Sequence, residues 1–265
     1  MNDEFYRKEY DSEGCKLPKQ IMAAEVRTPS VVVVDHFYND PDEVRNWAIG
    51  ECHFQQPGEH GAVGYRSEQD RKFFTNAKEC IESVMNGKVI DGEQEGGWEY
   101  PTNGCFQWCP AGTPIAYHSD SQQYAGVLFL TPDAPTDTGT SLYRHKDTGI
   151  DWIPQTEAEC WKYFSCSWED LHNAVFGKYG GKQGTPSPNP PNNRQMLLRT
   201  HESNYLDGTQ FEKTDEIANI YNRLVIFDAK KIHAASGYFG DNIHNSRLFQ
   251  LFFFDLKKEE DTLYE

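Results

Sequence analysis

Residues 118–130 read HSDSQQYAGVLFL, and this stretch decides the fold. Its second part, Tyr124 to Leu130, is an apolar run of the length of a buried strand. Its first part places a histidine, His118, and a carboxylate, Asp120, two positions apart just before that strand. In extended backbone, residues i and i+2 project to the same face, so the two side chains can converge on one point. The stretch therefore predicts two ligands of a metal site at the entry to a strand.

A third ligand is offered by His233, which follows the strongly apolar strand that begins at Leu224. Two imidazoles and one carboxylate form the facial triad of non-haem Fe(II) oxygenases, which leaves coordination positions open for a co-substrate and O₂. We therefore expect His118, Asp120 and His233 to be the metal ligands and, through the metal, the catalytic residues. The alternative is a β-fold in which the two histidines are merely hydrogen-bonded.

Arg247 lies fourteen residues beyond His233 and opens the aromatic strand Leu248 to Phe254. A guanidinium at the mouth of an aromatic sheet is costly unless it holds an anion, and its planar fork suits a carboxylate. Arg247 is thus a candidate anchor for a dicarboxylate whose other end chelates the metal. A surface ion pair with one of the many acidic residues is the alternative.

The rest of the chain predicts short strands after initial helices. Val31 to Val34 is expected to be a buried strand that leads into a helix capped by Asp40 and begun by Pro41. A second helix is expected from about Asn76 to Met85. Further strands are expected at 104–108, 123–130, 140–143, 223–227 and 248–254. This order favours a mainly β sandwich or barrel with supporting α-helices.

A single domain is expected over 1–265, with two additions. Residues 1–30 form an N-terminal extension, and residues 150–222 are interpreted as an insertion between core strands. Part of the insertion, Thr156 to Val175, has helical spacing, whereas 177–193 reads GKYGGKQGTPSPNPPNN and cannot build regular structure. The insertion is either a surface excursion or a lid over the active site.

Composition restricts the compartment and the partners. The 265 residues include 25 Lys and Arg against 41 Asp and Glu, a formal charge of −16, which disfavours long nucleic acids as substrates. No apolar run is long enough to cross a bilayer, and the acidic N-terminus is unlike a signal peptide. Seven scattered cysteines without a C-x-x-C pair favour free thiols. We expect a cytoplasmic protein, in a cell or in a virus-infected host cell, whose oligomeric state stays open.

Several segments resemble a known superfamily. They are VVVVDHFYNDPDEVR (31–45), HSDSQQYAGVLFLTPDAPTDTGTSLYRHKDTG (118–149) and NRLVIFDAKKIHAASGYFGDNIHNSRLFQLFFF (222–254). In order and spacing they are similar to Fe(II)- and 2-oxoglutarate-dependent oxygenases of the prolyl-4-hydroxylase-like branch, and more narrowly to an uncharacterised phage and bacterial family within it. The resemblance implies a double-stranded β-helix, of the jelly-roll or cupin-like type, and Fe(II) and 2-oxoglutarate as cofactors.

The resemblance also assigns residue roles. It places the metal on His118, Asp120 and His233 and the C5 carboxylate of 2-oxoglutarate on Arg247. Two positions that carry hydroxyls in characterised prolyl hydroxylases are Ala125 and Phe129 here, so other polar groups must bind the co-substrate; the candidates are Tyr117, Tyr124 and Thr140. The presence of Asp120, where related halogenases have a small residue, favours hydroxylation.

Substrate contacts are expected near the mouth of the site, from Tyr143, Arg144 and Trp152, because such folds vary function through their loops. His145 is expected to be a solvated loop residue, and the pair His201–Glu202 an ordinary exposed pair.

The sequence thus predicts an oxidoreductase, a dioxygenase that hydroxylates a C–H bond of an unidentified small molecule or peptide and releases succinate and CO₂. The alternative is a non-catalytic jelly-roll module that binds a ligand or a partner.

Overall fold

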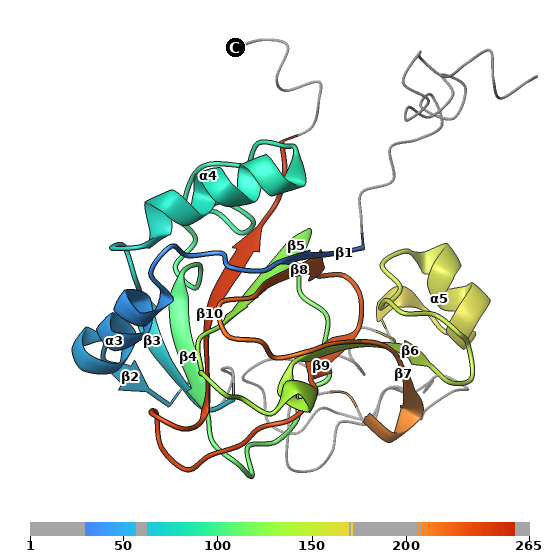
Figure 1. Cartoon of the computed structure of the whole chain (residues 1–265). Helices are drawn as coiled ribbons and strands as arrows, with labels where there is room; N and C mark the ends of the chain where they lie inside the picture. Colours follow the sequence, from blue (N-terminus) through green and yellow to red (C-terminus); the bar gives the residue numbers. More distant parts are fainter. Residues whose placement is uncertain (1–29, 57–62, 170, 172–205, 207, 258–265) are drawn as a thin grey trace, which may run out of the picture. The chain divides into compact units, whose positions relative to one another are not determined.

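The computed structural model describes residues 30–56, 63–169, 171, 206 and 208–257. These residues form two antiparallel sheets and three α-helices, α3 (Pro41–Glu51), α4 (Phe74–Met85) and α5 (Glu157–Phe164) (Figure 1). The seven-stranded sheet has the order β1 (Val31–Val34), β8 (Leu224–Asp228), β5 (Tyr124–Phe129), β10 (Arg247–Phe254), β4 (Cys105–Cys109), β3 (Tyr65–Gln69), β2 (Phe54–Gln55). The three-stranded sheet has the order β7 (Phe211–Ile217), β6 (Thr140–His145), β9 (His233–Ala235).

The path of the chain between the two sheets defines the fold. Strands β4 and β5 lie in the larger sheet, β6 and β7 in the smaller, and then β8, β9 and β10 alternate between larger, smaller and larger. Between β4 and β5, His118 bridges to His233 of β9 and so extends the smaller sheet. A chain that winds in this way between two antiparallel sheets is a double-stranded β-helix. The predicted mainly β fold with supporting helices is confirmed.

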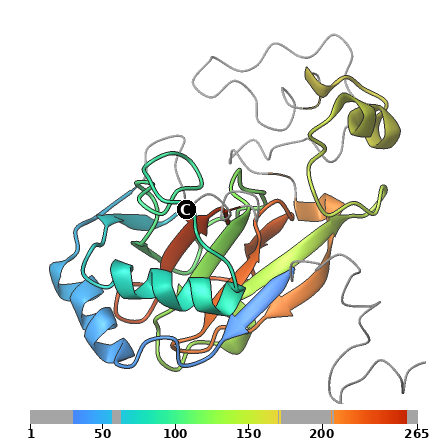
Figure 2. The same ribbon diagram turned by 90° about the horizontal axis from the view of Figure 1, so that it is seen from above.

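The two faces of the larger sheet have different partners, as β5 illustrates. Tyr124 and Leu128 lie in the core on one face, packed with Ala48 of α3 and Ile81 of α4. Figure 2 shows α4 running along that side of the sheet. Alternate residues face the other way, because successive side chains of a strand point to opposite faces. Ala125 and Val127 belong to a second apolar cluster, which includes Leu142 of β6. The space between the sheets therefore lies on the face away from the helices.

Local sequence explains both predicted helices. The carboxylate of Asp40 accepts a hydrogen bond from the amide of Glu43 at 2.9 Å, and Pro41 occupies the first turn of α3. Asn86, the residue after α4, adopts the left-handed conformation. Backbone amides at this cap donate hydrogen bonds to carbonyl oxygens of the last turn. The predicted start of the first helix at Pro41 is confirmed, and the second helix begins two residues before the expected Asn76 and ends at the expected Met85.

Some expectations need correction. Val31–Val34 is an edge strand rather than a buried one, and Val33 is 44% exposed, because only β8 pairs with it. Strand β7 falls inside the expected insertion 150–222 but pairs along its whole length with β6. Its run FEKTDEI has exposed charges at its centre, as suits an edge strand, and so lacks the apolar alternation of a buried strand. Apart from Ser30, the extension 1–30 lies outside the described residues, as do 177–193.

Helix α5 occupies the first half of the segment predicted as helical from Thr156 to Val175. It begins with a capping box, in which the Thr156 hydroxyl accepts from the amide of Glu159 and the Glu159 carboxylate accepts from the amide of Thr156. It ends at Ser165 in the left-handed conformation.

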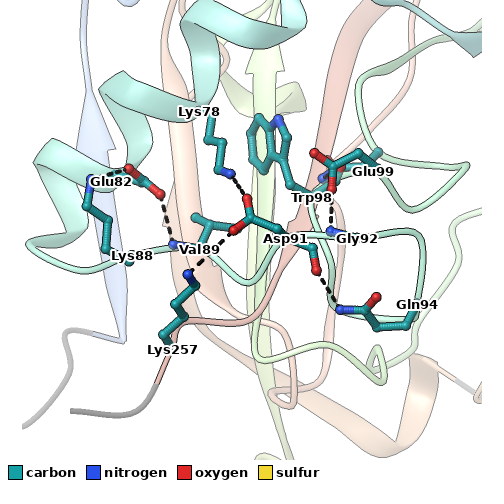
Figure 3. A network of polar contacts seen from close by, with 11 residues as sticks. Lys78, Glu82, Lys88, Val89, Asp91, Gly92, Gln94, Trp98, Glu99 and Lys257 are labelled. Atoms are coloured by element: carbon teal, nitrogen blue, oxygen red, sulfur yellow. Dashed lines mark hydrogen bonds and ion pairs between the residues drawn. The ribbon is translucent and has the colours of Figure 1, made fainter. Parts of the chain in front are cut away.

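A polar network fastens the segment after α4 to the end of β10 (Figure 3). Asp91 is ion-paired with Lys78 of α4 and with Lys257, which follows β10. Glu82 of α4 binds the Lys88 ammonium at 2.6 Å and the amide of Val89 at 3.1 Å. These contacts hold the loop that continues to Glu95 and Tyr100, which line the cavity described below.

No helix among the described residues is long and apolar enough to cross a membrane. The six described cysteines are free thiols.

Candidate metal centre and its cavity

The two predicted histidine ligands are held opposite each other by the backbone. The amide of His118 donates to the carbonyl of His233 at 3.1 Å, and the amide of His233 donates to the carbonyl of His118 at 2.8 Å. The two ring centroids are 4.3 Å apart. Two residues far apart in sequence are thereby fixed as one antiparallel pair, which the smaller sheet extends through β9 and β6.

Each imidazole is oriented by a backbone carbonyl two residues before it. Nδ1 of His118 lies 2.9 Å from the carbonyl oxygen of Ala116, and Nδ1 of His233 lies 2.8 Å from that of Lys231. A carbonyl oxygen only accepts, so both Nδ1 atoms carry the proton. In the neutral rings Nε2 then carries the lone pair with which an imidazole binds a metal.

Asp120 completes the cluster. Its amide donates to the carbonyl of Ala229 at 2.8 Å, which ties the loop after His118 to the end of β8. Its Oδ1 lies 3.5 Å from Nε2 of His118, and its Oδ2 lies 3.4 Å from Nε2 of His233. Oδ2 is buried and has no hydrogen-bond partner among the described residues. A buried carboxylate oxygen aimed at two imidazole nitrogens is the arrangement expected of ligands around a cation.

The pKa shifts of these groups favour the forms that bind a metal, namely a neutral imidazole and an ionised carboxylate. Desolvation, together with the neighbouring His233 ring, lowers the pKa of His118, which favours its neutral form. Burial alone would raise the pKa of Asp120, but the imidazoles of His118 and His233 and the guanidinium of Arg66 favour the ionised carboxylate, and the pKa is lowered. One atom from each of the three residues lies within 4.8 Å of the others, and among the described residues no other such group of three occurs. The donor set therefore fits a divalent transition metal such as iron.

The cluster opens into a cavity of about 500 Å³ between the two sheets. Arg247, at the first position of β10, lines the same cavity and is 3% exposed. Its Nε donates to the carbonyl of Thr138 at 2.9 Å, and its Nη2 donates to that of Gly139 at 3.2 Å. The guanidinium also lies over the ring of Phe249, 4.4 Å from its centroid.

Arg247 forms no ion pair with an acidic side chain of the described residues. Two carbonyl oxygens accept hydrogen bonds from the guanidinium, and aromatic rings surround it, but neither carries a compensating negative charge. Its burial lowers the pKa of the guanidinium, as expected for a desolvated cation. The alternative of an ordinary surface ion pair is thereby wrong. A buried cation that faces a cavity suits an anionic ligand.

The three other candidates for the co-substrate lie in different places. Thr140 is buried at the start of β6 and lines the cavity. Tyr124 lies on the helix-facing side of β5 with its ring stacked on Phe254, 5.5 Å between centroids. Tyr117 packs at the edge of a third apolar cluster, which includes Tyr143, Phe164 and Ile232. The ring centroids of Tyr117 and Tyr143 are 4.9 Å apart. Of these three residues, only Thr140 is brought together with Arg247.

A tyrosine that sequence reasoning did not single out, Tyr238, also lines the cavity. Its ring centroid is 5.7 Å from the guanidinium carbon of Arg247. It comes from the connection between β9 and β10. The sequence of that connection has no periodicity that would reveal which of its side chains enters the cavity.

The residues predicted to contact substrate lie outside the lining of this cavity. Tyr143 is buried in the third cluster, and Trp152 packs against its edge. Arg144 is ion-paired with Glu212 of β7 at 2.5 Å. None of these three lines the cavity in the described part of the chain.

The expectation for His145 is wrong. It is fully buried at the end of β6, because the turn after it closes back on the strand, with its Nδ1 2.8 Å from the hydroxyl of Thr148. His201 and Glu202 lie outside the described residues.

Comparison with known proteins adds likeness of structure only. No protein-family model and no curated protein matches the chain. Among solved structures, it is similar to a prolyl hydroxylase from Trichoplax adhaerens in complex with a hypoxia inducible factor peptide fragment, with 11% identity, 91% of this chain and 89% of that chain covered, and a TM-score of 0.43. It is also similar to HygX from Streptomyces hygroscopicus with nickel and 2-oxoglutarate bound, with 9% identity, 88% and 95% covered, and a TM-score of 0.41.

Proposed function

We propose that the protein is an Fe(II)- and 2-oxoglutarate-dependent dioxygenase that hydroxylates a C–H bond of a small molecule or peptide. The observation that carries this proposal is one cavity with two features, the His118–Asp120–His233 cluster and the buried guanidinium of Arg247, which has no acidic partner among the described residues. A ligand with a chelating group at one end and a carboxylate at the other matches both features, and 2-oxoglutarate is such a ligand.

The protein groups have distinct roles in this reaction. Iron bound with 2-oxoglutarate and O₂ would supply the oxidation of the C–H bond, with release of succinate and CO₂. The carbonyls of Ala116 and Lys231 keep the two imidazoles in the tautomer that binds metal. Arg247 orients the co-substrate through its distal carboxylate, and Thr140 and Tyr238 line the same cavity. The apolar wall formed by Ala125, Val127 and Phe227 limits water.

The alternative of a non-catalytic binding module makes a different prediction for 2-oxoglutarate. Titration of 2-oxoglutarate into Mn(II)-loaded protein, followed by calorimetry, should show binding that requires both the metal and Arg247. Succinate formation from Fe(II), O₂ and 2-oxoglutarate should follow the same requirements. Metal binding without any affinity for 2-oxoglutarate would favour the binding module instead.

The substrate can be sought with the same reaction. A cell lysate incubated with protein, Fe(II) and 2-oxoglutarate should contain a species that gains the mass of one oxygen atom in proportion to succinate. An outcome such as desaturation would instead show a loss of two hydrogens.

A further inference from the structure

An acidic residue, Glu95, lines the same cavity as the metal cluster but does not belong to that cluster. Its Oε1 accepts a hydrogen bond from the hydroxyl of Ser121 and a longer one, of 3.4 Å, from Nε2 of Gln122. Ser121 directly follows Asp120, the carboxylate of the metal cluster. Two neighbours of a metal-binding residue thus fix the position of the Glu95 carboxylate beside the metal cluster.

The loop that carries Glu95 is fixed on both sides of this residue. Before it, the network around Asp91 holds the beginning of the loop (Figure 3). After it, the carbonyl of Gly96 accepts a hydrogen bond from the amide of Asp255 at 2.8 Å, and the carboxylate of Asp255 accepts one from the amide of Gln123. Asp255 therefore joins this loop, the end of β10 and the start of β5. A side chain on such a support is already in place before a ligand binds, which lowers the entropic cost of binding.

Glu95 and Arg247 belong to opposite ends of the larger sheet. Arg247 is the first residue of β10 and Phe254 the last, so about 20 Å of extended strand separates them. Tyr124, which follows the metal-binding loop, pairs with Phe254, and the Glu95 loop is bonded to the next residue along β10. The metal cluster and Glu95 are therefore at the same end. A co-substrate that extends from the metal toward Arg247 leaves Glu95 for another ligand.

The other charged residues that line the cavity have contacts or roles of their own. Arg247 suits the anionic end of the co-substrate, Asp120 suits the metal, and Arg66 donates through Nε to Oε1 of Gln107 at 2.8 Å. Glu95 is exposed and forms no ion pair with a cation of the described residues. The formal charge of −16 attracts cations toward the protein as a whole. A carboxylate without a counter-ion at the mouth of the cavity therefore favours a positively charged ligand.

We propose that Glu95 binds a cationic group of the substrate, a primary ammonium or a guanidinium, and that Ser121 is the residue that positions its carboxylate. This inference rests on the proposed function, because it takes Arg247 and the metal cluster to be occupied by the co-substrate. Tyr100 and Phe253 line the same cavity and supply aromatic surface, to which cations also bind. The substrate would then lie with its cation at Glu95 and its reactive carbon toward the metal.

Three small probes test the proposal, namely methylammonium, methylguanidinium and neutral N-methylurea. Each is added to protein saturated with Mn(II) and 2-oxoglutarate, at about 0.15 M salt to screen the long-range attraction of the acidic protein. The paramagnetic relaxation of the methyl protons is then measured by NMR. One of the two cations should be relaxed several-fold more than N-methylurea, and the stronger of the two identifies the cationic group. Equal relaxation of all three, or none, would overturn the proposal.

Variants assign the effect to the residue. Glu95→Gln should weaken binding of the cationic probe about fivefold, which is the loss of one ion pair that water still reaches. Glu93→Gln is the matched control, because it removes the same charge from an exposed residue of the same loop that does not line the cavity. Glu95→Asp should retain part of the effect, and Ser121→Ala should weaken binding less than Glu95→Gln because the charge remains. A Glu95→Gln protein that keeps its melting temperature and binds the probe as tightly as Glu93→Gln would contradict the assignment.

The two proposals can fail separately. If wild-type protein with Mn(II) does not bind 2-oxoglutarate, the proposed function fails. The probes are then tested on metal-free protein by saturation-transfer NMR, where the difference between Glu95→Gln and Glu93→Gln still decides the cation site. If 2-oxoglutarate binds to wild type but not to Glu95→Gln, Glu95 is a co-substrate residue and the substrate assignment is wrong.

The lysate experiment gives an independent check. The species that gains one oxygen atom should be retained on a cation-exchange resin at neutral pH, since it carries the group that Glu95 binds. An oxygenated species that passes through the resin would overturn the inference and leave the proposed function standing.

Discussion

The guanidinium of Arg247 lies over the ring of Phe249, two residues further along the same strand, at 4.4 Å from its centroid. Residues i and i+2 of a strand share a face, so an apolar ring and a cation occupy the same side of β10. The ring leaves the edge of the guanidinium open toward the cavity while two carbonyls hold Nε and Nη2. This arrangement suits an in-plane ligand such as a carboxylate.

Arg247→Gln should therefore weaken binding of 2-oxoglutarate. A hydrogen bond to a charged group contributes about 1.5–3 kcal/mol, so we expect an affinity loss of about 10- to 150-fold. Calorimetric titration of the Mn(II)-loaded variant measures it. Arg223→Gln, which removes a surface ion pair with Asp35, is the control and should bind like wild type. Unchanged affinity in the Arg247 variant would contradict the role of this residue.

Tyr238→Phe should have a smaller effect on the same binding. The change removes the hydroxyl of a residue that lines the cavity but keeps the ring that lies 5.7 Å from the guanidinium. The hydroxyl is an uncharged donor, so we expect its removal to cost about 1 kcal/mol, which corresponds to about a fivefold weaker affinity for 2-oxoglutarate. Tyr221→Phe, which removes a surface hydrogen bond to Asp42, is the matched control. If Tyr238→Phe equals wild type, another group solvates the distal carboxylate.

The metal cluster gives a sharper test. His118→Ala and Asp120→Ala should each lower the affinity for Mn(II) by at least about tenfold, because each removes one of three donors. Electron paramagnetic resonance of free Mn(II) measures this directly. The variants should also lose succinate formation. Succinate production equal to that of wild type in His118→Ala would disprove the triad.

Removal of a carboxylate from a metal-free cluster has a further consequence. Asp120 carries a lowered pKa, so its ionised form stabilises the folded protein above the ordinary pKa of an aspartate, and this stability is lost as pH falls through the lowered value. In the absence of metal, the free energy of unfolding of Asp120→Asn should therefore decrease less at acidic pH than that of wild type. Urea unfolding of metal-free protein between about pH 3 and pH 5 measures the difference.

The sequence predicted those parts of the fold in which pattern and burial coincide. The apolar strands around Val127, Val225 and Leu251 are buried on both faces. Arg247 opens one of them, and the triad residues lie in the segments just before or after the other two. By contrast, β3 has the sequence YRSEQ, with polar residues on both faces, because it lies near the edge of the sheet. Its periodicity indicates no strand, and so Arg66 could not be placed in the cavity.

The hydroxyl groups that bind the co-substrate could not be predicted from the sequence either. Which side of β5 faces the cavity decides between Tyr124 and Ala125, and a strand buried on both faces has no polar side to reveal its orientation. His145 was misplaced for a related reason. Its neighbours Arg144 and Lys146 are exposed, so the local sequence resembles a loop, although β6 pairs on both sides.

His145 provides the last prediction, on pH. It is buried beside the rings of Phe164 and Phe211, and its Nε2 has no hydrogen-bond partner among the described residues. This burial lowers the pKa of His145 below its ordinary value of 6.5, despite the opposing charge of Asp147. Below pH 6.5 the unfolded chain gains a proton that the folded protein does not, so the free energy of unfolding should fall as pH decreases.

One such group changes the stability by at most about 1.4 kcal/mol per pH unit. The substitution His145→Asn can retain the contact with Thr148 but removes the titrating group, so the stability of this variant should depend less on pH between about pH 7 and pH 5. Urea unfolding at the two pH values, compared with His244→Asn at an exposed histidine, measures the difference. If the His145→Asn variant kept the full pH dependence of wild type, His145 would have to take up its proton in the folded state, which requires water or a partner at Nε2.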